Sequence, residues 1–434
     1  MNKNRLFVTF CGVVLVALLL AACQPAATEA PTAAPTEAPT EAPTEAPTAA
    51  PTEAPVGETY KIGFAPAITG PGASLGDPEH QTGKMLAEKL MTEGVVGPDG
   101  VMHPVEIIIY DTETNPDAAV SVVRKMIEED KVQVVVAGTT SGVSMAIVPI
   151  ATEAGVAYIS MASAGAIVND PETGAVREWV FKTAQDNYAS AKWQADYITA
   201  MGWTSVCHIY QNSGYGNDTF KQATTAFGEA GITIAYSAAF ESAATEFPEL
   251  AEVGTSGCQA VVVGAIPPAS STVSVAIREQ YPDIPIIHGH GTCNQDHIDL
   301  MGSDVAEGMV SPCGKVMVAD TLPDDDPQKE IVTQYAADYT AFTGKPVNTF
   351  GGHGWDALML AVNALATLPD GQDLATQRAG VRDAIENGVT GWPGISGVYN
   401  LSAEDHFSLD YLSLVFVKVV DGKWVYYPQE EWAK

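Results

Sequence analysis

Apolar and polar positions between residues 132 and 164 follow the pattern of a strand, a helix and a second strand. The run Val132–Val136, apolar except for Gln133, is typical of a parallel strand that is buried on both faces. Apolar residues then recur at helical spacing as far as Gly155, which ends helices readily because glycine adopts positive φ. A second apolar run, Val156–Ile159, predicts the next strand of the same sheet.

Small, mostly hydroxyl-bearing residues follow each of these strands. The carboxyl ends of neighbouring parallel strands lie at one edge of a sheet, where open α/β folds bind ligands. The hydroxyl and N–H of Ser141 are therefore candidates to hold an anion. The second turn adds the backbone N–H groups of Ala162, Ser163 and Ala164. The alternative interpretation is that small residues only permit tight turns here.

The alternation of strands and helices continues on both sides of this stretch. Further strands are predicted at Tyr60–Ala65, Val105–Tyr110 and Trp179–Thr183, and then at Ser205–Tyr210, Ile232–Ser237, Ala260–Gly264, Ile284–His288 and Ala306–Pro312. Three helices follow at 325–342, 351–367 and 374–387, and the chain closes with a hairpin. Two α/β sheets of similar size predict two Rossmann-like lobes with a small-molecule cleft between them.

Single residues predict several turns and helix ends. Asn115 is suited to cap the helix whose first residue is Pro116, because proline lacks only an N–H that has no helical partner. Asp421–Gly422 is typical of a two-residue hairpin turn.

The N-terminus has the features of an export signal. Basic residues precede the apolar stretch Leu6–Leu20, which is short for a membrane span. The following Leu-Ala-Ala-Cys resembles a bacterial lipobox, which implies a signal peptide over residues 1–22 and a lipid on Cys23. The alternative is an ordinary signal peptide with a chance cysteine. The lipid would hold the protein on the outer face of the cell membrane.

Composition separates the following segment from the folded part. Proline recurs every fourth residue from Pro31 to Pro55, and the segment has no residues that build a core. Residues 23–57 are therefore expected to form a disordered, extended tether behind the lipid. The net charge of −32 excludes nucleic acid as a partner, because phosphates would be repelled. It suits a soluble monomer.

Four cysteines remain beyond Cys23. Outside the cytosol they permit two disulfides in three pairings. Cys293 and Cys313 both follow predicted strands close in sequence, so this pair is favoured. Cys207 and Cys258 would then form the other.

Several motifs together resemble the type I periplasmic binding proteins of ABC importers, in the branched-chain amino acid and amide group. They are KIGFAPAITGPGASLGD, VEIIIYDTETNPDAAVSVVRKMIEED, VVVAGTTSGVSMAIVPIATEAGVAYIS, EWVFKTAQDN and EGMVSP, and the likeness extends over about 58–427.

This resemblance implies two lobes joined by a hinge that the chain crosses three times. The first lobe would comprise 58–183 and 314–397, and the second would comprise 184–313 and 398–434. Proteins of this kind are not enzymes and need no cofactor. They close over a small molecule and present it to the permease subunits of an ABC transporter.

The resemblance also assigns ligand contacts. Ser141 matches a serine whose hydroxyl binds the ligand carboxylate, and Ala162 matches a residue that offers its N–H. Ala164 replaces a threonine of leucine-type receptors, so only its N–H is available. Tyr215 matches an aromatic residue of the second lobe.

Other positions depart from the family pattern. Leu75 replaces a tyrosine, His290–Gly291 replaces the acidic residue that pairs with an α-ammonium, and Ile266–Pro267 replaces a second aromatic residue. A buried ammonium without a carboxylate costs several kcal/mol. Segments such as SLGDPEH and HGHGT resemble a subgroup associated with uptake of aromatic carboxylates. We therefore expect an organic carboxylate, an amino acid or an aromatic acid. An aromatic ring would pack against Leu75, Tyr215, Pro267 and His290.

Other functions fit parts of the sequence. His288, His290, Cys293 and His297 are types of residue that bind zinc, although a disulfide would occupy Cys293. P-loop and zincin motifs are missing from the sequence, which argues against an enzyme. A sensory receptor of the same fold is a further alternative.

Two residues at the start of one predicted helix have two interpretations. Trp355 either packs in the core of the first lobe, which is favoured, or faces the cleft. The same question stays open for His353.

Overall fold

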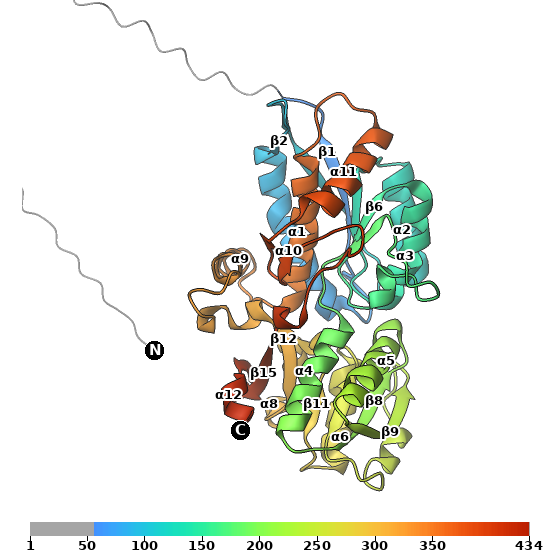
Figure 1. The fold of residues 1–434 in the computed structure, drawn as a ribbon, viewed down its shortest axis with the longest axis vertical. Helices are drawn as coiled ribbons and strands as arrows, with labels where there is room; N and C mark the ends of the chain where they lie inside the picture. Colours follow the sequence, from blue (N-terminus) through green and yellow to red (C-terminus); the bar gives the residue numbers. More distant parts are fainter. Residues whose placement is uncertain (1–55, 434) are drawn as a thin grey trace, which may run out of the picture. The chain divides into compact units, whose positions relative to one another are not determined.

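A computed structural model describes residues 56–433 (Figure 1). The predicted signal peptide, Cys23 and almost all of the proline-rich tether lie outside the described residues. Within 56–433, no helix combines the length and the apolar character that crossing a membrane requires.

Five parallel strands form the sheet of the first lobe, in the order β4-β1-β5-β6-β7. Their bounds are Tyr60–Ala65 for β1, Val105–Ile109 for β4, Val134–Ala137 for β5, Ala157–Ser160 for β6 and Val180–Lys182 for β7. Every residue of β5 and β6 is buried, as their apolar runs predict. The strand order reverses at β1, so the turns after β1 and β5 meet at the carboxyl edge.

Helices cover both faces of this sheet. They are α1 (Ala73–Glu93), α2 (Pro116–Glu128), α3 (Ser141–Ala154), α10 (Thr349–Leu365) and α11 (Leu374–Gly388). One apolar core lies under α1, α10 and α11, and another lies under α2 and α3. Asn115 caps α2 by accepting from the N–H groups of Asp117 and Ala118, and Gly155 ends α3 at φ 60°. Both helix ends lie where the sequence predicts them.

Seven strands form the sheet of the second lobe, in the order β16-β15-β12-β11-β10-β8-β9. The bounds are Ser205–Gln211 for β8, Thr233–Phe240 for β9, Val261–Gly264 for β10, Ile286–His288 for β11, Val310–Gly314 for β12, Leu414–Val420 for β15 and Lys423–Tyr426 for β16. The helices are α4 (Asn187–Ala200), α5 (Gly214–Glu229), α6 (Ala269–Gln280), α7 (Gln295–Met301) and α12 (Gln429–Trp432). The antiparallel hairpin β15–β16 turns at Asp421 and Gly422, which both have positive φ.

The predicted start of β12 is wrong. Residues Ser303–Ala306 form the short helix α8, and Gly308 then redirects the chain at φ 79°. The strand therefore begins at Val310 and not at Ala306.

Two disulfides join elements of the second lobe. Cys207 on β8 is bonded to Cys258, and Cys293 is bonded to Cys313 on β12. This is the pairing that the cysteine positions favoured.

The packing of the C-terminal part changes the expected boundary between the lobes. Tyr399, Leu401 and Leu409 belong to the apolar core of the first lobe, whereas Leu414 belongs to a core of the second. The third crossing therefore lies after Leu409 rather than at 398. Helix α9 (Lys329–Thr343) packs on α1 of the first lobe, where the Tyr335 hydroxyl lies 2.8 Å from that of Thr82, and its buried side chains also join a core of the second lobe.

A buried carboxylate ties the crossing segments together. Asp356 on α10 accepts hydrogen bonds from the N–H groups of Ile395–Ser396 at 2.6 and 2.8 Å. The hydroxyl of Tyr399 lies 2.9 Å from Asp356 and 2.9 Å from the carbonyl of Thr183 in the first crossing. Gln185, in the same crossing, donates from Nε2 to the carbonyl of Ser396 at 2.6 Å. Burial raises the pKa of Asp356 to about 7.

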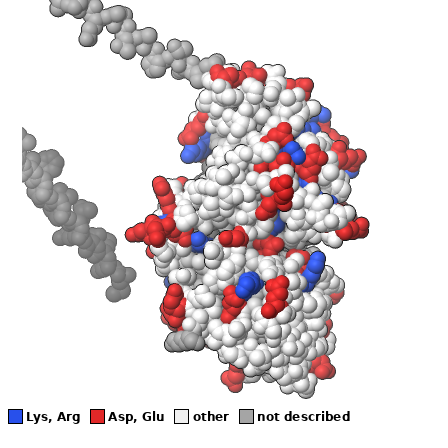
Figure 2. Space-filling view, viewed as in Figure 1, with Lys and Arg blue, Asp and Glu red and all other residues white. Residues whose placement is uncertain are grey.

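Acidic side chains outnumber basic ones on the face that Figure 2 shows, in agreement with the net charge of −32. The protein is therefore surrounded by a negative electrostatic potential.

Two glycines of α5 allow a controlled test of packing. A Cβ at Gly216 would overlap the carbonyl oxygen of Gln211, whereas a Cβ at Gly228 would meet no atom within 4 Å. We expect Gly216→Ala to lower the free energy of unfolding by about 2 kcal/mol or more. Gly228→Ala should raise it by roughly 0.5–1 kcal/mol, because alanine favours helix. Urea unfolding followed by circular dichroism measures both, and equal effects would contradict this account.

Candidate functional site

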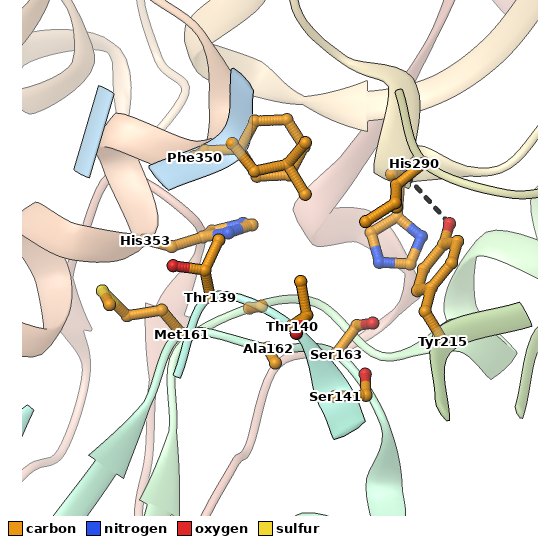
Figure 3. Close-up of a pocket in the computed structure, with 14 residues that line it drawn as sticks. Thr139, Thr140, Ser141, Met161, Ala162, Ser163, Tyr215, His290, Phe350 and His353 are labelled. Carbon is orange, nitrogen blue, oxygen red and sulfur yellow. Dashed lines mark hydrogen bonds between the residues drawn. The ribbon is translucent and has the colours of Figure 1, made fainter. Parts of the chain in front are cut away.

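A pocket with an empty volume of about 340 Å³ lies where the turns of the first lobe meet those of the second (Figure 3). Turns after β5, β6 and β7 line it from the first lobe, with α1 and α10, and the second lobe adds three segments. The lining residues are Leu75, Thr139, Thr140, Ser141, Met161, Ala162, Ser163, Ala184, Tyr215, Ile266, His290, Gly291, Phe350 and His353.

The N-terminus of α3 opens into this pocket. Ser141 is the first residue of the helix, and the N-cap residue Thr140 makes no side-chain cap hydrogen bond. The N–H groups of a first helical turn have no partner within the helix, and the helix dipole makes them favourable for negative charge. The Ser141 hydroxyl adds a further polar group that is 2% exposed.

Two of the three N–H groups expected in the second turn have protein partners. Ala162 donates to Ser160 Oγ at 3.1 Å, and Ala164 donates to Ser141 Oγ at 3.4 Å. Ala164 therefore supports Ser141 from behind and does not line the pocket, in contrast to the prediction for its N–H. No hydrogen bond of the Ser163 N–H is found among residues 56–433.

A buried cation lies directly behind the pocket. Lys182 is 1% exposed, and its Nζ donates to the carbonyls of Ser163 and Ala184 at 3.1 and 2.9 Å. Nζ also lies 3.4 Å from the centroid of the Phe407 ring. Within the described chain Lys182 forms no ion pair. Burial lowers the pKa of Lys182 to about 8, and the more distant Asp186, Asp218 and Asp405 oppose this shift.

Tyr215 and His290 form the side of the pocket that belongs to the second lobe. Gly291 donates its N–H to the Tyr215 hydroxyl at 2.9 Å, the dashed line in Figure 3. A Cβ at Gly291 would lie 2.6 Å from that oxygen, so the contact needs glycine. The ring of His290 meets Tyr215 edge-on, with centroids 6.0 Å apart. Burial, and secondarily the charge of Lys182, lowers the pKa of His290 to about 4.

Apolar side chains from both lobes meet across the pocket. Leu75 and Phe350 of the first lobe form one buried cluster with Tyr215 and Ile266 of the second. The walls are therefore apolar, and the 14 lining residues include no carboxylate, lysine or arginine. Glu79 is the acid behind the wall: it hydrogen-bonds to the Thr139 hydroxyl, and burial raises its pKa well above its usual value.

Most of the site residues that the sequence indicated lie together. Leu75, Ser141, Ala162, Ser163, Tyr215 and His290 line the pocket, whereas Ala164 and Pro267 do not. Pro267 is buried, and its neighbour Ile266 faces the pocket in its place. Trp355 does not line it either. It is half-buried between apolar cores and stacks on Trp392, with centroids 6.0 Å apart.

Some residues of the pocket wall were not predicted from the sequence. Thr139, Thr140 and Met161 belong to the two turns already recognised, so their positions were a usable signal. Phe350 comes from the first turn of α10, far along the chain, and no local pattern connects it to the pocket. His353, for which the sequence left two interpretations open, lies one turn further along α10 and lines the pocket. Asn348 caps α10 by accepting from Gly351 and so directs this turn.

The histidine-rich segment does not assemble the zinc site that its spacing suggests. Cys293 is consumed by a disulfide. His297 is hydrogen-bonded to Ser270 and Ser271, and His288 to Ser274. Among residues 56–433, no group of three potential metal ligands is found.

Two sheets whose carboxyl edges share one apolar, uncharged pocket define a two-lobed small-molecule-binding protein. Residues 59–423 match the family model described as Periplasmic binding protein, and the chain belongs to that family. The proteins that it resembles are solute-binding proteins, and this chain is not an enzyme.

Solved structures agree with this assignment. An extracellular ligand-binding receptor from Rhodopseudomonas palustris HaA2 is 25% identical, with a TM-score of 0.77, over 85% of this chain and 99% of that one. The leucine binding protein LivK from Thermotoga maritima is 18% identical, with a TM-score of 0.70, over 85% and 98%. The branched-chain amino acid transporter substrate binding protein LivJ from Streptococcus pneumoniae, in complex with isoleucine, is 20% identical, with a TM-score of 0.69, over 84% and 97%. The last two show a shared fold. A comparison with curated proteins gave no match.

A glycine pair tests whether the two lobes must touch. A Cβ at Gly214 of α5 would lie 2.7 Å from the backbone nitrogen of Gly142 in α3, whereas a Cβ at Gly142 would meet nothing nearer than 4.0 Å. We expect Gly214→Ala to weaken ligand binding by roughly tenfold through steric hindrance of lobe contact. Gly142→Ala is the matched control and should bind as the unaltered protein does. Calorimetry measures both, and equal affinities would rule out this contact as a requirement for binding.

Proposed function

We propose that this protein is the substrate-binding component of an ABC importer and binds a small organic carboxylate. The signal peptide and Cys23 would anchor it by lipid to the outer face of the membrane, and it would deliver the ligand to permease subunits. Loss of membrane retention in Cys23→Ser is the test of the anchor. A sensory receptor of the same fold is the alternative, which would bind the same ligand but need no permease.

The observation that carries the carboxylate assignment is the buried, unpaired charge of Lys182. A cation in a protein interior is stabilised strongly by a nearby anion. Its carbonyl partners belong to Ser163 and Ala184, which both line the pocket. An anion at Ser141 would therefore accept hydrogen bonds from the N–H groups of α3 and from the serine hydroxyl. It would also be attracted by the positive charge of Lys182.

The pocket offers little to an α-ammonium group. Its lining has no carboxylate, and burial favours the protonated, neutral form of Glu79 behind Thr139. A buried ammonium would then lack a charged partner. An aromatic acid suits the walls better, because opening of the lobes would expose the apolar side chains of Phe350, Tyr215 and Ile266 to a ring. The names of the leucine- and isoleucine-binding structures keep an amino acid as the alternative ligand.

A calorimetric panel decides between these ligands. Benzoate, cinnamate and coumarate would be titrated beside leucine, valine and short amides, after a denaturing wash has removed carried-over ligand. We expect an aromatic acid to bind at micromolar affinity, which corresponds to about −8 kcal/mol. Tight leucine binding without aromatic-acid binding would refute the aromatic assignment.

Replacing Lys182 tests whether its charge attracts the ligand carboxylate. Lys182→Met should weaken carboxylate binding by roughly tenfold, because it removes the buried charge. Lys192→Met is the control, since Lys192 pairs with Asp196 and its side chain is 43% exposed. Both variants are measured by calorimetry with the same acid.

The charge of Lys182 also predicts how the affinity for a carboxylate ligand depends on pH. Lys182 is protonated below its pKa of about 8, so carboxylate affinity should fall as pH rises through that value. His290 stays neutral above about pH 4 and should not contribute between pH 6 and 9. In Lys182→Met this alkaline loss should disappear. An unchanged alkaline loss in that variant would assign it to another group.

A further inference from the structure

His353 combines burial with a ring nitrogen that has no protein partner. It is 2% exposed and reaches the pocket from α10 (Figure 3). Its Nε2 lies 3.0 Å from Gln185 Oε1, while within 56–433 no hydrogen-bonding group is in range of its Nδ1. A buried polar atom left unpaired is costly, so a group that pairs with Nδ1 is favoured in this pocket.

The hydrogen bonds of Gln185 determine which nitrogen of His353 carries the proton. The amide nitrogen of Gln185 is 2.6 Å from the carbonyl oxygen of Ser396, which can only accept. The amide oxygen of Gln185 therefore faces His353 and must receive a proton from Nε2. In the neutral imidazole Nδ1 is then an acceptor. Burial, with smaller contributions from the charges of His290 and Lys182, lowers the pKa of His353 to about 3 and keeps the ring neutral.

We infer that His353 is a specificity-determining residue that selects ligands carrying a hydrogen-bond donor, such as a hydroxyl or amino group. The inference rests on the proposed function for the other end of the ligand, a carboxylate at Ser141. Figure 3 shows the two residues on different sides of the pocket. The ligand class is therefore a carboxylate with a distal O–H or N–H group.

The remaining polar groups fit this orientation. The Tyr215 hydroxyl accepts from Gly291 and keeps its own hydrogen for a ligand acceptor. Donors therefore come from the Ser141 and Tyr215 hydroxyls and the α3 terminus, whereas His353 offers an acceptor. Of the other lining groups, the neutral ring of His290 supplies one donor and one acceptor and is compatible with either end of a ligand. The Ser163 N–H is a further donor, and the Thr140 and Ser163 hydroxyls can donate or accept.

The test is a matched set of probes that varies charge and donor separately. Benzoate, 4-hydroxybenzoate, benzamide and 4-hydroxybenzamide are titrated by calorimetry, with the corresponding cinnamate set for greater length. We expect the hydroxylated acid to bind at least about tenfold more tightly than the unsubstituted acid. Equal affinity of these two acids, or no binding of any hydroxylated acid, would overturn the inference.

The same set separates the inference from the proposed function. If the acids bind and the amides do not, but hydroxylation has no effect, the carboxylate assignment stands and the role of His353 fails. If hydroxylated amides bind as well as hydroxylated acids, the role of His353 stands and the carboxylate assignment fails.

Two variants locate the preference on one nitrogen. In His353→Asn the side-chain oxygen can replace Nδ1 but cannot reach Gln185, and in His353→Gln the amide can reach Gln185 but leaves no acceptor at Nδ1. We expect the Asn variant to retain the preference for the hydroxylated acid and the Gln variant to lose it. The opposite result would overturn the inference, as would equal loss in both, which a purely structural role predicts.

NMR of protein labelled with ¹⁵N at its histidines shows which ring nitrogen of His353 carries the proton, and it needs no ligand. The His353 signal, assigned by its loss in His353→Asn, should have the shifts of a neutral ring protonated at Nε2. A ring protonated at Nδ1 would overturn the inference even if the variants were too unstable to titrate.

Discussion

The hydrogen bonds of Asp356 are the constraint on which the geometry of the site depends. One buried carboxyl group on α10 holds the backbone of Ile395–Ser396 and, through Tyr399, the carbonyl of Thr183. The first crossing and the segment that precedes the third are thereby fixed to the helix that carries His353 and Phe350. Gln185 adds a bond from the same crossing to Ser396. These hydrogen bonds join the crossings to the helix that carries two pocket-lining residues.

The positive charge of Lys182 lies behind the pocket wall, whereas the polar groups that line the pocket are neutral. Lys182 contributes a field but is screened from the cavity by the backbone of Ser163 and Ala184. The groups that touch a ligand are neutral: hydroxyls, helix N–H groups and imidazoles whose pKa values burial lowers. An anion can thus be held without a direct ion pair, which avoids desolvating two opposed charges in contact. The walls then discriminate by shape and by the placement of single donors and acceptors.

Local sequence patterns predicted the parts of the fold that depend on local physics. Apolar runs identified β5 and β6, and Asn115, Pro116 and Gly155 gave the helix ends at the correct residues. The turns after these strands led to Ser141, Ala162 and Ser163 for the same reason.

The features that escaped prediction depend on contacts between distant segments. Phe350 was not predicted, and the position of His353 was left open, because both lie on a helix whose apolar pattern serves the core equally well and spacing alone does not distinguish a cleft position from a buried one. The sequence pattern predicted that the N–H of Ala164 contacts the ligand, but in the structure this N–H donates to the Ser141 hydroxyl oxygen. The boundary at 398 was misplaced because the chain forms a short hairpin, in which Trp392–Pro393 pair with Val398–Tyr399, and then continues in the first lobe. Tyr399, Leu401 and Leu409 all pack in the first core.

The acidic surface has a consequence for association kinetics. Electrostatic steering usually accelerates capture of an oppositely charged ligand. An anionic ligand of the class proposed above would approach a protein of net charge −32 and would meet repulsion until it is close to the buried lysine. Added salt screens the long-range repulsion, over roughly 8 Å at physiological ionic strength, more than it screens the interior attraction. The on-rate for such a ligand would therefore increase with ionic strength, the reverse of the usual dependence. Capture would be fastest in salty surroundings and slowest in fresh water.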